Sequence, residues 1–289
     1  MMFKPKTLIS ISLLSIYASA SMAVAPIGPS RALLGEDEKG IGLSLSHQSM
    51  NLCADGDFIE QQPAALATGQ ADLDLDIKNL VSNPIFATLN YGINQDWDVF
   101  IRIGVVNAKD DIEVESNRPV AATRFLNTGN EASLNSGHEL AWGIGSRATF
   151  YEDDSISWGG SFHMTWLDPE SSSDTMTGLT GETATVDLDL KYWEIIVAGG
   201  PTINFGDYWI YGGPFLHFVR GDLDIDGTWV DTGIGPFPMN GSTDVEEESI
   251  IGGHVGAQWN QTEDLCWNAE VSFTGDAWGL GISGLWRIP

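Results

Sequence analysis

Basic residues, cysteines and long apolar runs are all scarce in this sequence. Only 13 Lys and Arg stand against 40 Asp and Glu, and the net charge of −27 disfavours nucleic acid as a partner. The two cysteines, Cys53 and Cys266, are too few for a disulfide scaffold. The best candidate for a spanning helix after the first twenty-odd residues, 195–198, runs directly into Gly199, Gly200 and Pro201. A helical membrane protein is therefore excluded.

The N-terminus has the layout of a secretory signal. Lys4 and Lys6 precede the apolar stretch 7–17, and a run of small residues ends at Ala23. The apolar part is too short to span a membrane as a helix. We therefore expect a signal peptide over 1–23, with Ala20 as an alternative cleavage site, and an N-terminal periplasmic segment over 24–39.

From residue 40 onward, strands of alternating polarity are joined by very short turns and long polar segments. In 85–105 the odd positions are apolar on both sides of a turn at 94–96. Three more hairpins turn near 152–154, 206–207 and 260–264, between a first strand at 41–45 and a last one at 278–286. In the third hairpin the apolar phase changes near Tyr192 and Trp193, which we interpret as a β-bulge. The pattern predicts ten strands, with eight or twelve as alternatives.

The less apolar face of these strands indicates whether the sheet encloses a packed core or a polar lumen. It carries more charge than a packed soluble core tolerates, so we expect it to line a lumen. The predicted ionic network of that lumen consists of Asp98, Arg102, Glu139, Arg147, His254, Glu270 and Arg287. The fold predicted for 40–289 is an all-β, antiparallel, up-and-down barrel that spans the outer membrane. Its long extracellular loops are expected near 51–83, 107–137, 168–183 and 227–247.

Tryptophans cluster at both ends of the predicted strands, as in the aromatic girdles of membrane barrels. Those expected near the short turns are Trp97, Trp209, Trp259, Trp267 and Trp286. Those expected near the loops are Trp142, Trp166 and Trp278.

Several of these segments resemble the small outer-membrane β-barrel proteins of the opacity-type, porin-like superfamily. The resemblance rests on 91–93, 97–104, 143–151 and 211–215, and it spans most of the chain after the signal. It implies membrane anchoring with surface exposure or passive permeation, and it carries over no catalytic position. The chain departs from the pattern at its end, where 286–289 lacks a terminal aromatic residue.

Two groups in the predicted lumen admit a chemical as well as a structural role. If Trp259 pairs with Leu265, then His254 faces Glu270, and Ser272 lies one pair further along. An acid, a base and a hydroxyl suit a membrane hydrolase, whereas a plain ion pair is the simpler interpretation and the one we favour. The remaining charges either form a gate or neutralise one another in a narrow lumen.

The loop segments are rich in acidic residues and poor in basic ones, a composition that could bind calcium. However, 72–76 and 222–226 alternate strictly between Asp and an apolar residue, as strands extending above the membrane would, and neither has the spacing of a calcium loop. The five histidines show no metal-ligand spacing. We expect no cofactor and no metal site, with at most weak binding of divalent cations.

The expected function is a structural or surface-exposed role in the outer membrane, or a narrow, cation-preferring passive channel. The alternatives are a membrane-embedded hydrolase and an adhesin that uses the acidic loops. We favour a protein that is not an enzyme. The expected partners are outer-membrane lipid, lipopolysaccharide and the barrel assembly machinery, with the chain itself a monomer. Cys53 and Cys266 are expected on opposite membrane sides and therefore not to form a disulfide.

Overall fold

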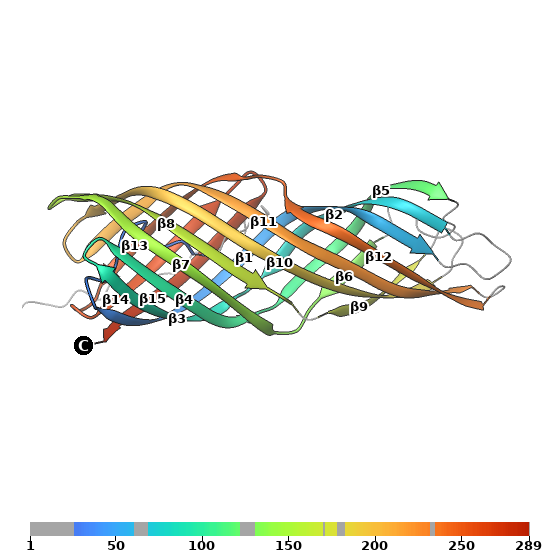
Figure 1. Cartoon of the computed structure of the whole chain (residues 1–289), viewed down its shortest axis with the longest axis horizontal. Coiled ribbons are helices and arrows are strands. Elements are labelled where there is room, and N and C mark those ends of the chain that lie inside the picture. The colour runs from blue at the N-terminus through green and yellow to red at the C-terminus, as the bar shows by residue number, and fades with distance from the viewer. Residues whose placement is uncertain are drawn as a thin grey trace, which may run out of the picture.

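A computed structural model describes residues 26–60, 69–121, 131–169, 171–177, 183–231 and 235–288 as one antiparallel sheet of fifteen strands (Figure 1). None of these residues forms a helix that is long and apolar enough to cross a membrane. The strands are β1 Lys39–Glu60, β2 Gly69–Ser82, β3 Ile85–Asn94, β4 Trp97–Val106, β5 Ala108–Ala121, β6 Glu131–Asn135, β7 Glu139–Glu152, β8 Ile156–Leu167, β9 Ser172–Thr177, β10 Thr183–Asn204, β11 Tyr208–Asp231, β12 Gly235–Glu247, β13 Ile251–Asn260, β14 Leu265–Phe273 and β15 Ala277–Ile288.

Ten of the strands close into a ring, which confirms the predicted barrel. The order is β1, β3, β4, β7, β8, β10, β11, β13, β14 and β15, and β15 pairs with the first half of β1 from Lys39↔Ile288 to Met50↔Ala277. A closed ring leaves no strand edge exposed, which is the condition for crossing lipid as a sheet. The turns β3–β4, β7–β8, β10–β11 and β13–β14 are short and lie at one end of the barrel.

A second tube of strands continues from the other end of the ring. The far halves of β1, β10 and β11 pair with β2, β9 and β12, and β5 and β6 extend the sheet beyond β2. Between β6 and β9 the backbone N–H of Ser133 donates to Asp174 Oδ2 at 2.6 Å. The segments predicted as long loops are thus largely strands, and the predicted extensions at 72–76 and 222–226 are confirmed. We call this part the extracellular tube, after the side of the membrane on which the sequence predicts it, and the ten-stranded ring the membrane barrel.

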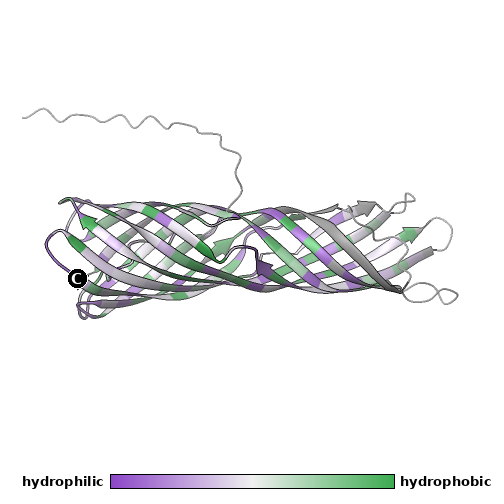
Figure 2. Cartoon of the chain, turned by 90° about the horizontal axis from the view of Figure 1, so that it is seen from above, coloured by the Kyte–Doolittle hydropathy of each residue, from purple (hydrophilic) through white to green (hydrophobic). Residues whose placement is uncertain are grey.

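The polarity of the wall inverts where the two tubes meet. In β10 the even-numbered side chains point inward along the whole strand, from Ala184 to Thr202. In the extracellular tube the inward side chains are apolar, such as Leu188, and the outward ones are acids, such as Asp187; in the membrane barrel the inward Glu194 is polar and the outward Val197 is apolar. Figure 2 shows the alternation of polar and apolar residues along the strands of both tubes.

No β-bulge accompanies this inversion, so the predicted bulge near residues 192–193 is wrong. The pairing of β10 with β11 keeps one register from Thr183↔Val230 to Asn204↔Trp209. The hydrophobic phase changes because the surroundings change from lipid outside to water outside, while the backbone continues unchanged.

The outer face of the membrane barrel is an apolar belt bordered by aromatic residues. Ile101 is 56% exposed, whereas Asp98, which points the opposite way from β4, is fully buried. Trp97, Trp142, Trp166, Trp259, Trp267, Trp278 and Trp286 lie on the outward side of their strands, as predicted. Trp209 points inward instead, because it lies two residues before the inward Tyr211 on the same side of β11. Its neighbour Tyr208 points outward and stacks on Trp259, with the two ring centres 6.3 Å apart.

Candidate functional site

The lumen of the membrane barrel is polar, and the half nearer the short turns, predicted to be the periplasmic end, is filled by the residues that precede β1. Residues 26–38, which we call the plug, enter from the short-turn end and run along the inner wall. The expected periplasmic segment 24–39 is therefore, in its described part, folded back into the barrel. No periodicity in these residues indicated this.

The first anchor of the plug is the carboxylate of Glu270, which lies on the inner wall in β14. Its Oε1 accepts a hydrogen bond from the backbone N–H of Ile27 and its Oε2 one from that of Gly28, both at 2.8 Å. Gly28 has a φ of 74°, a left-handed conformation that glycine adopts without strain. Hydrogen bonds to an ionised acceptor are stronger than neutral ones, so this pair fixes the direction of the chain.

The second anchor is an ion pair in β4 and β7. Arg147 Nε lies 2.9 Å from Asp98 Oδ1, and its Nη2 donates to Asn90 Oδ1 at 2.9 Å. The other carboxylate oxygen, Asp98 Oδ2, accepts from the backbone N–H of Leu33 at 2.5 Å and of Leu34 at 3.3 Å. One buried carboxylate thus binds both the wall and the plug, which satisfies a charge that would otherwise be costly.

Side chains at the mouth of the barrel complete the attachment. Arg31 pairs with Glu152 at 2.9 Å and lies 4.4 Å from the ring centre of Trp209. The inward position of Trp209 therefore serves the plug and not the lipid interface. Arg287 Nη2 donates to the carbonyl oxygen of Leu33 at 3.0 Å.

Three glycines let the plug backbone approach the wall. A Cβ atom at Gly92 would lie 1.7 Å from the carbonyl oxygen of Gly35, and one at Gly159 would lie 1.8 Å from that of Ser30. At Gly281 it would meet the ring of Pro26 at 1.9 Å. The sequence shows these glycines only as small strand residues, and their role depends on a segment more than 50 residues away.

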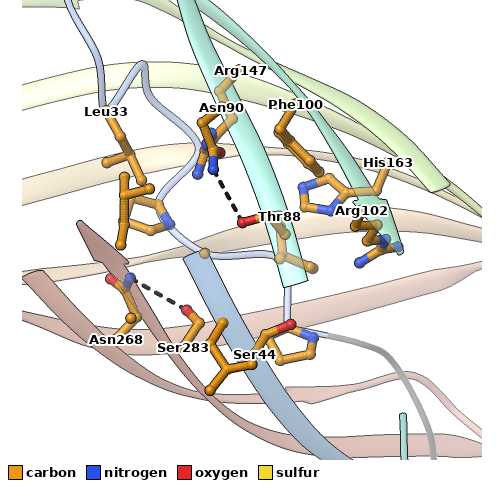
Figure 3. Close-up of a pocket in the computed structure, with 17 residues that line it drawn as sticks. Leu33, Ser44, Thr88, Asn90, Phe100, Arg102, Arg147, His163, Asn268 and Ser283 are labelled. Carbon is orange, nitrogen blue, oxygen red and sulfur yellow. Dashed lines mark hydrogen bonds between the residues drawn. The ribbon is translucent and has the colours of Figure 1, made fainter. Parts of the chain in front are cut away.

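A small cavity lies beside the plug. A cavity of about 70 Å³ lies between the plug and the wall, next to Asn90, Phe100, Arg102, Arg147 and His163 (Figure 3). A volume of this size accommodates a few waters and no larger solute.

The predicted ionic network separates into parts. Asp98, Arg147, Glu270 and Arg287 hold the plug, as described. Arg102 turns away from them, donates to Thr165 Oγ1 and lies 4.9 Å above the ring of Phe86. Glu139 was wrongly included, because it lies exposed at the extracellular end of β7, beyond the enclosed lumen.

The predicted facing pair of His254 and Glu270 is also wrong. Trp259 pairs with Trp267, so His254 lies opposite Ser272, and Glu270 lies opposite Gly256. The turn has the expected five residues but lies one residue later in the chain, at 261–265, where Gln261 N–H and Thr262 N–H both donate to the carbonyl oxygen of Leu265. The acid, base and hydroxyl are thus not aligned as the hydrolase alternative required.

The sequence interpretation missed a second buried pair higher in the lumen. Glu194 Oε1 lies 3.1 Å from His217 Nε2, and both side chains are almost fully buried. The strict alternation of β10 would have placed Glu194 inward, but the assumed bulge obscured it. In the described part of the chain, no group of three or more His, Cys, Asp or Glu side chains is arranged to hold a metal ion.

Comparison with known proteins gives likenesses of fold only. No family profile matches the sequence, and no curated protein matches it. Among solved structures, the outer membrane protease OmpT from Escherichia coli has 10% identity and a TM-score of 0.44, over 89% of this chain and 97% of that one. The attachment invasion locus protein Ail of Yersinia pestis has 12% identity and a TM-score of 0.28, over 88% and 99%. The outer membrane protein OprG from Pseudomonas aeruginosa has 10% identity and a TM-score of 0.37, over 88% and 98%.

The physical character of the barrel itself indicates a sheet that spans lipid. A closed ring of ten antiparallel strands carries an apolar belt outside and charged groups inside, which is the arrangement that lipid demands of a spanning sheet. The chain is a closed ten-stranded antiparallel β-barrel with the outer surface of a membrane-spanning sheet.

Proposed function

We propose that this protein is a closed surface protein of the outer membrane, which displays the extracellular tube as a recognition surface and conducts no solute. The observation that carries the proposal is the interior of that tube. One continuous cluster of buried apolar side chains fills it, and its large members there include Phe58, Trp229, Phe237 and Met239. Fully burying one such side chain is worth about 1.5–3 kcal/mol, so the core is a stable closure and not a gate that opens at little cost.

The plug closes the other end of the same lumen. A solute on the way through would have to displace the plug from Glu270 and Asp98 and then pass the apolar core. Even with the plug removed, the core would remain as a barrier. This arrangement gives the channel hypothesis less support than the surface role.

The outer wall of the extracellular tube carries facing acidic side chains that lower the stability of the sheet. Charges that are kept at a cost to stability support a role in recognition. Asp187 lies directly opposite Asp226, and Asp189 lies directly opposite Asp224. Like charges directly across two strands are destabilising, and Lys191, which pairs with Asp189 at 2.5 Å, offsets only part of the repulsion among four aspartates. These four aspartates line a hollow of about 640 Å³ on the surface, which would suit a cationic partner.

The test is conductance across a planar lipid bilayer, for the wild-type chain and for Glu270→Gln. The expected result is a silent bilayer for both proteins, since weakening the plug leaves the apolar core in place. Discrete conductance steps from either protein would overturn the proposal and favour a passive channel. A matched control, Glu263→Gln, changes a carboxylate in an exposed turn near the same barrel end.

A further inference from the structure

The lipid-facing wall of the barrel has a groove of about 500 Å³ across β3, β4, β7 and β8. Tyr91, Val99, Ser146 and Phe162 lie in one row, each directly opposite the next in the strand register. All four point outward. The two small residues lie between the two rings, so the wall is hollowed there.

The floor of the groove is effectively apolar. Trp97 Nε1 donates to Ser146 Oγ at 2.8 Å, so the hydroxyl group is already engaged. Leu89, Ile101 and Ile144 line the groove on the side toward the middle of the membrane. An apolar chain would therefore cover the floor without leaving a polar group unsatisfied.

The groove opens toward charges of both signs at the periplasmic rim. Lys39, exposed at the start of β1, lies directly opposite Tyr91. The hydroxyl of Tyr91 donates to Asp37 Oδ1 at 2.6 Å, and Glu36 is exposed beside it. An ammonium group and two carboxylates thus lie next to the end of an apolar groove.

The tilt of the strands gives the groove its direction. Because strands in membrane barrels tilt by about 35–45°, a row of paired residues climbs from the rim toward the middle of the membrane. The row begins at Lys39, the first residue of β1, and reaches Val197, well within β10, beyond Phe162. A molecule held at Lys39 would extend along the groove into the apolar belt.

We propose that this groove binds one phospholipid of the periplasmic leaflet whose head group carries a phosphate and a primary ammonium, such as phosphatidylethanolamine. The phosphate pairs with Lys39, the ammonium pairs with the carboxylates of Asp37 and Glu36, and one acyl chain covers Val99 and Ser146. The occupant is a lipid because the groove lies inside the apolar belt. It is zwitterionic because the rim offers both signs of charge, whereas the carboxylates would repel an anionic head group. This inference is independent of the proposed surface role.

The test is native mass spectrometry of the full chain, released from detergent after incubation with phosphatidylethanolamine, phosphatidylglycerol or phosphatidylcholine of identical chains. The wild type is expected to retain one phosphatidylethanolamine in preference to the other two lipids. Val99→Phe fills the groove and should lower that retention by about fivefold or more, equivalent to about 1 kcal/mol. Val255→Phe makes the same change at an outward valine of the opposite wall, away from the groove; it is the control and should leave retention unchanged.

Lys39→Gln separates the head group from the acyl chain. It should remove the preference for phosphatidylethanolamine while leaving some lipid bound. Equal retention in Val99→Phe and Val255→Phe, or no preference among the three lipids in the wild type, would overturn the proposal. So would a dimer that Val99→Phe dissociates, because the groove would then be an interface between two copies. Circular dichroism of each variant confirms that the barrel is folded before the comparison is made.

Discussion

The attachment of the plug can be tested by changing a single carboxylate. Glu270 accepts two backbone hydrogen bonds of 2.8 Å, from Ile27 and Gly28. A hydrogen bond to an ionised group contributes about 1.5–3 kcal/mol. Glu270→Gln keeps one neutral acceptor and turns an amide NH₂ toward the other N–H, so the plug should lose roughly 2–4 kcal/mol of binding free energy.

Hydrogen–deuterium exchange read by mass spectrometry measures this loss directly. The backbone N–H groups of 27–34 exchange when the plug leaves the wall, and each 1.4 kcal/mol speeds exchange tenfold. Glu270→Gln should therefore accelerate exchange in this segment by roughly 30-fold to 1000-fold, while β14 stays protected. Glu263→Gln should have no effect. Arg287 donates its hydrogen bond to the backbone carbonyl oxygen of Glu263, which the substitution leaves unchanged. Equal exchange of 27–34 in the wild type and Glu270→Gln would refute the anchoring role of this carboxylate.

Three further predictions concern the membrane belt, a turn and the cysteines. Ile101→Arg should cost roughly 2–4 kcal/mol of unfolding free energy in vesicles, whereas Val230→Arg in the extracellular tube should cost far less; similar losses in urea titrations would argue against the belt. Hydrogen bonds from the backbone N–H groups of the β7–β8 turn lower the pKa of Asp153 to about 2. Its stabilising effect should be complete above the ordinary pKa near 3.8 and disappear as the pH falls through about 2, so Asp153→Asn should destabilise the barrel at pH 6 and not at pH 1.5, as followed by tryptophan fluorescence. Non-reducing peptide mapping should find no link between Cys53 and Cys266, since both thiols are free and lie in the extracellular tube and at the periplasmic end; a linked peptide would contradict the strand order.

Much of the membrane barrel could be predicted because polar and apolar side chains alternate along its strands. The pairing of β3 with β4 follows from a short turn and two strands whose odd positions are apolar, and both were recognisable in the sequence, although the turn is one residue shorter than the predicted 94–96. Ten strands and the outward girdle residues followed from the same rule. The error at β13–β14 arose from the position of the turn, which lies one residue later than predicted and so shifts every pair between the two strands by two residues.

Alternation alone could not reveal which medium lies outside a strand. The change of phase at Tyr192 and Trp193 marks the boundary between lipid and water, but a bulge would produce the same pattern. The plug was unpredictable for another reason. It binds through backbone N–H groups at Ile27 and Leu33, which every residue but proline possesses, so no side-chain pattern marks it.

The unbroken strands β10 and β11 determine how far the protein reaches from the cell. They are 22 and 24 residues long, and β10 is hydrogen-bonded along nearly its whole length to β8 or β9 on one side and β11 on the other. At a rise of about 3.3 Å per residue and a tilt of about 40°, their outer halves stand roughly 25–30 Å above the lipid surface. Because both strands are continuous, the acidic outer end of the tube is held at a fixed height and a fixed angle relative to the membrane barrel. A binding partner therefore meets the acidic outer end of the tube at this distance from the lipid surface, and not at the surface itself.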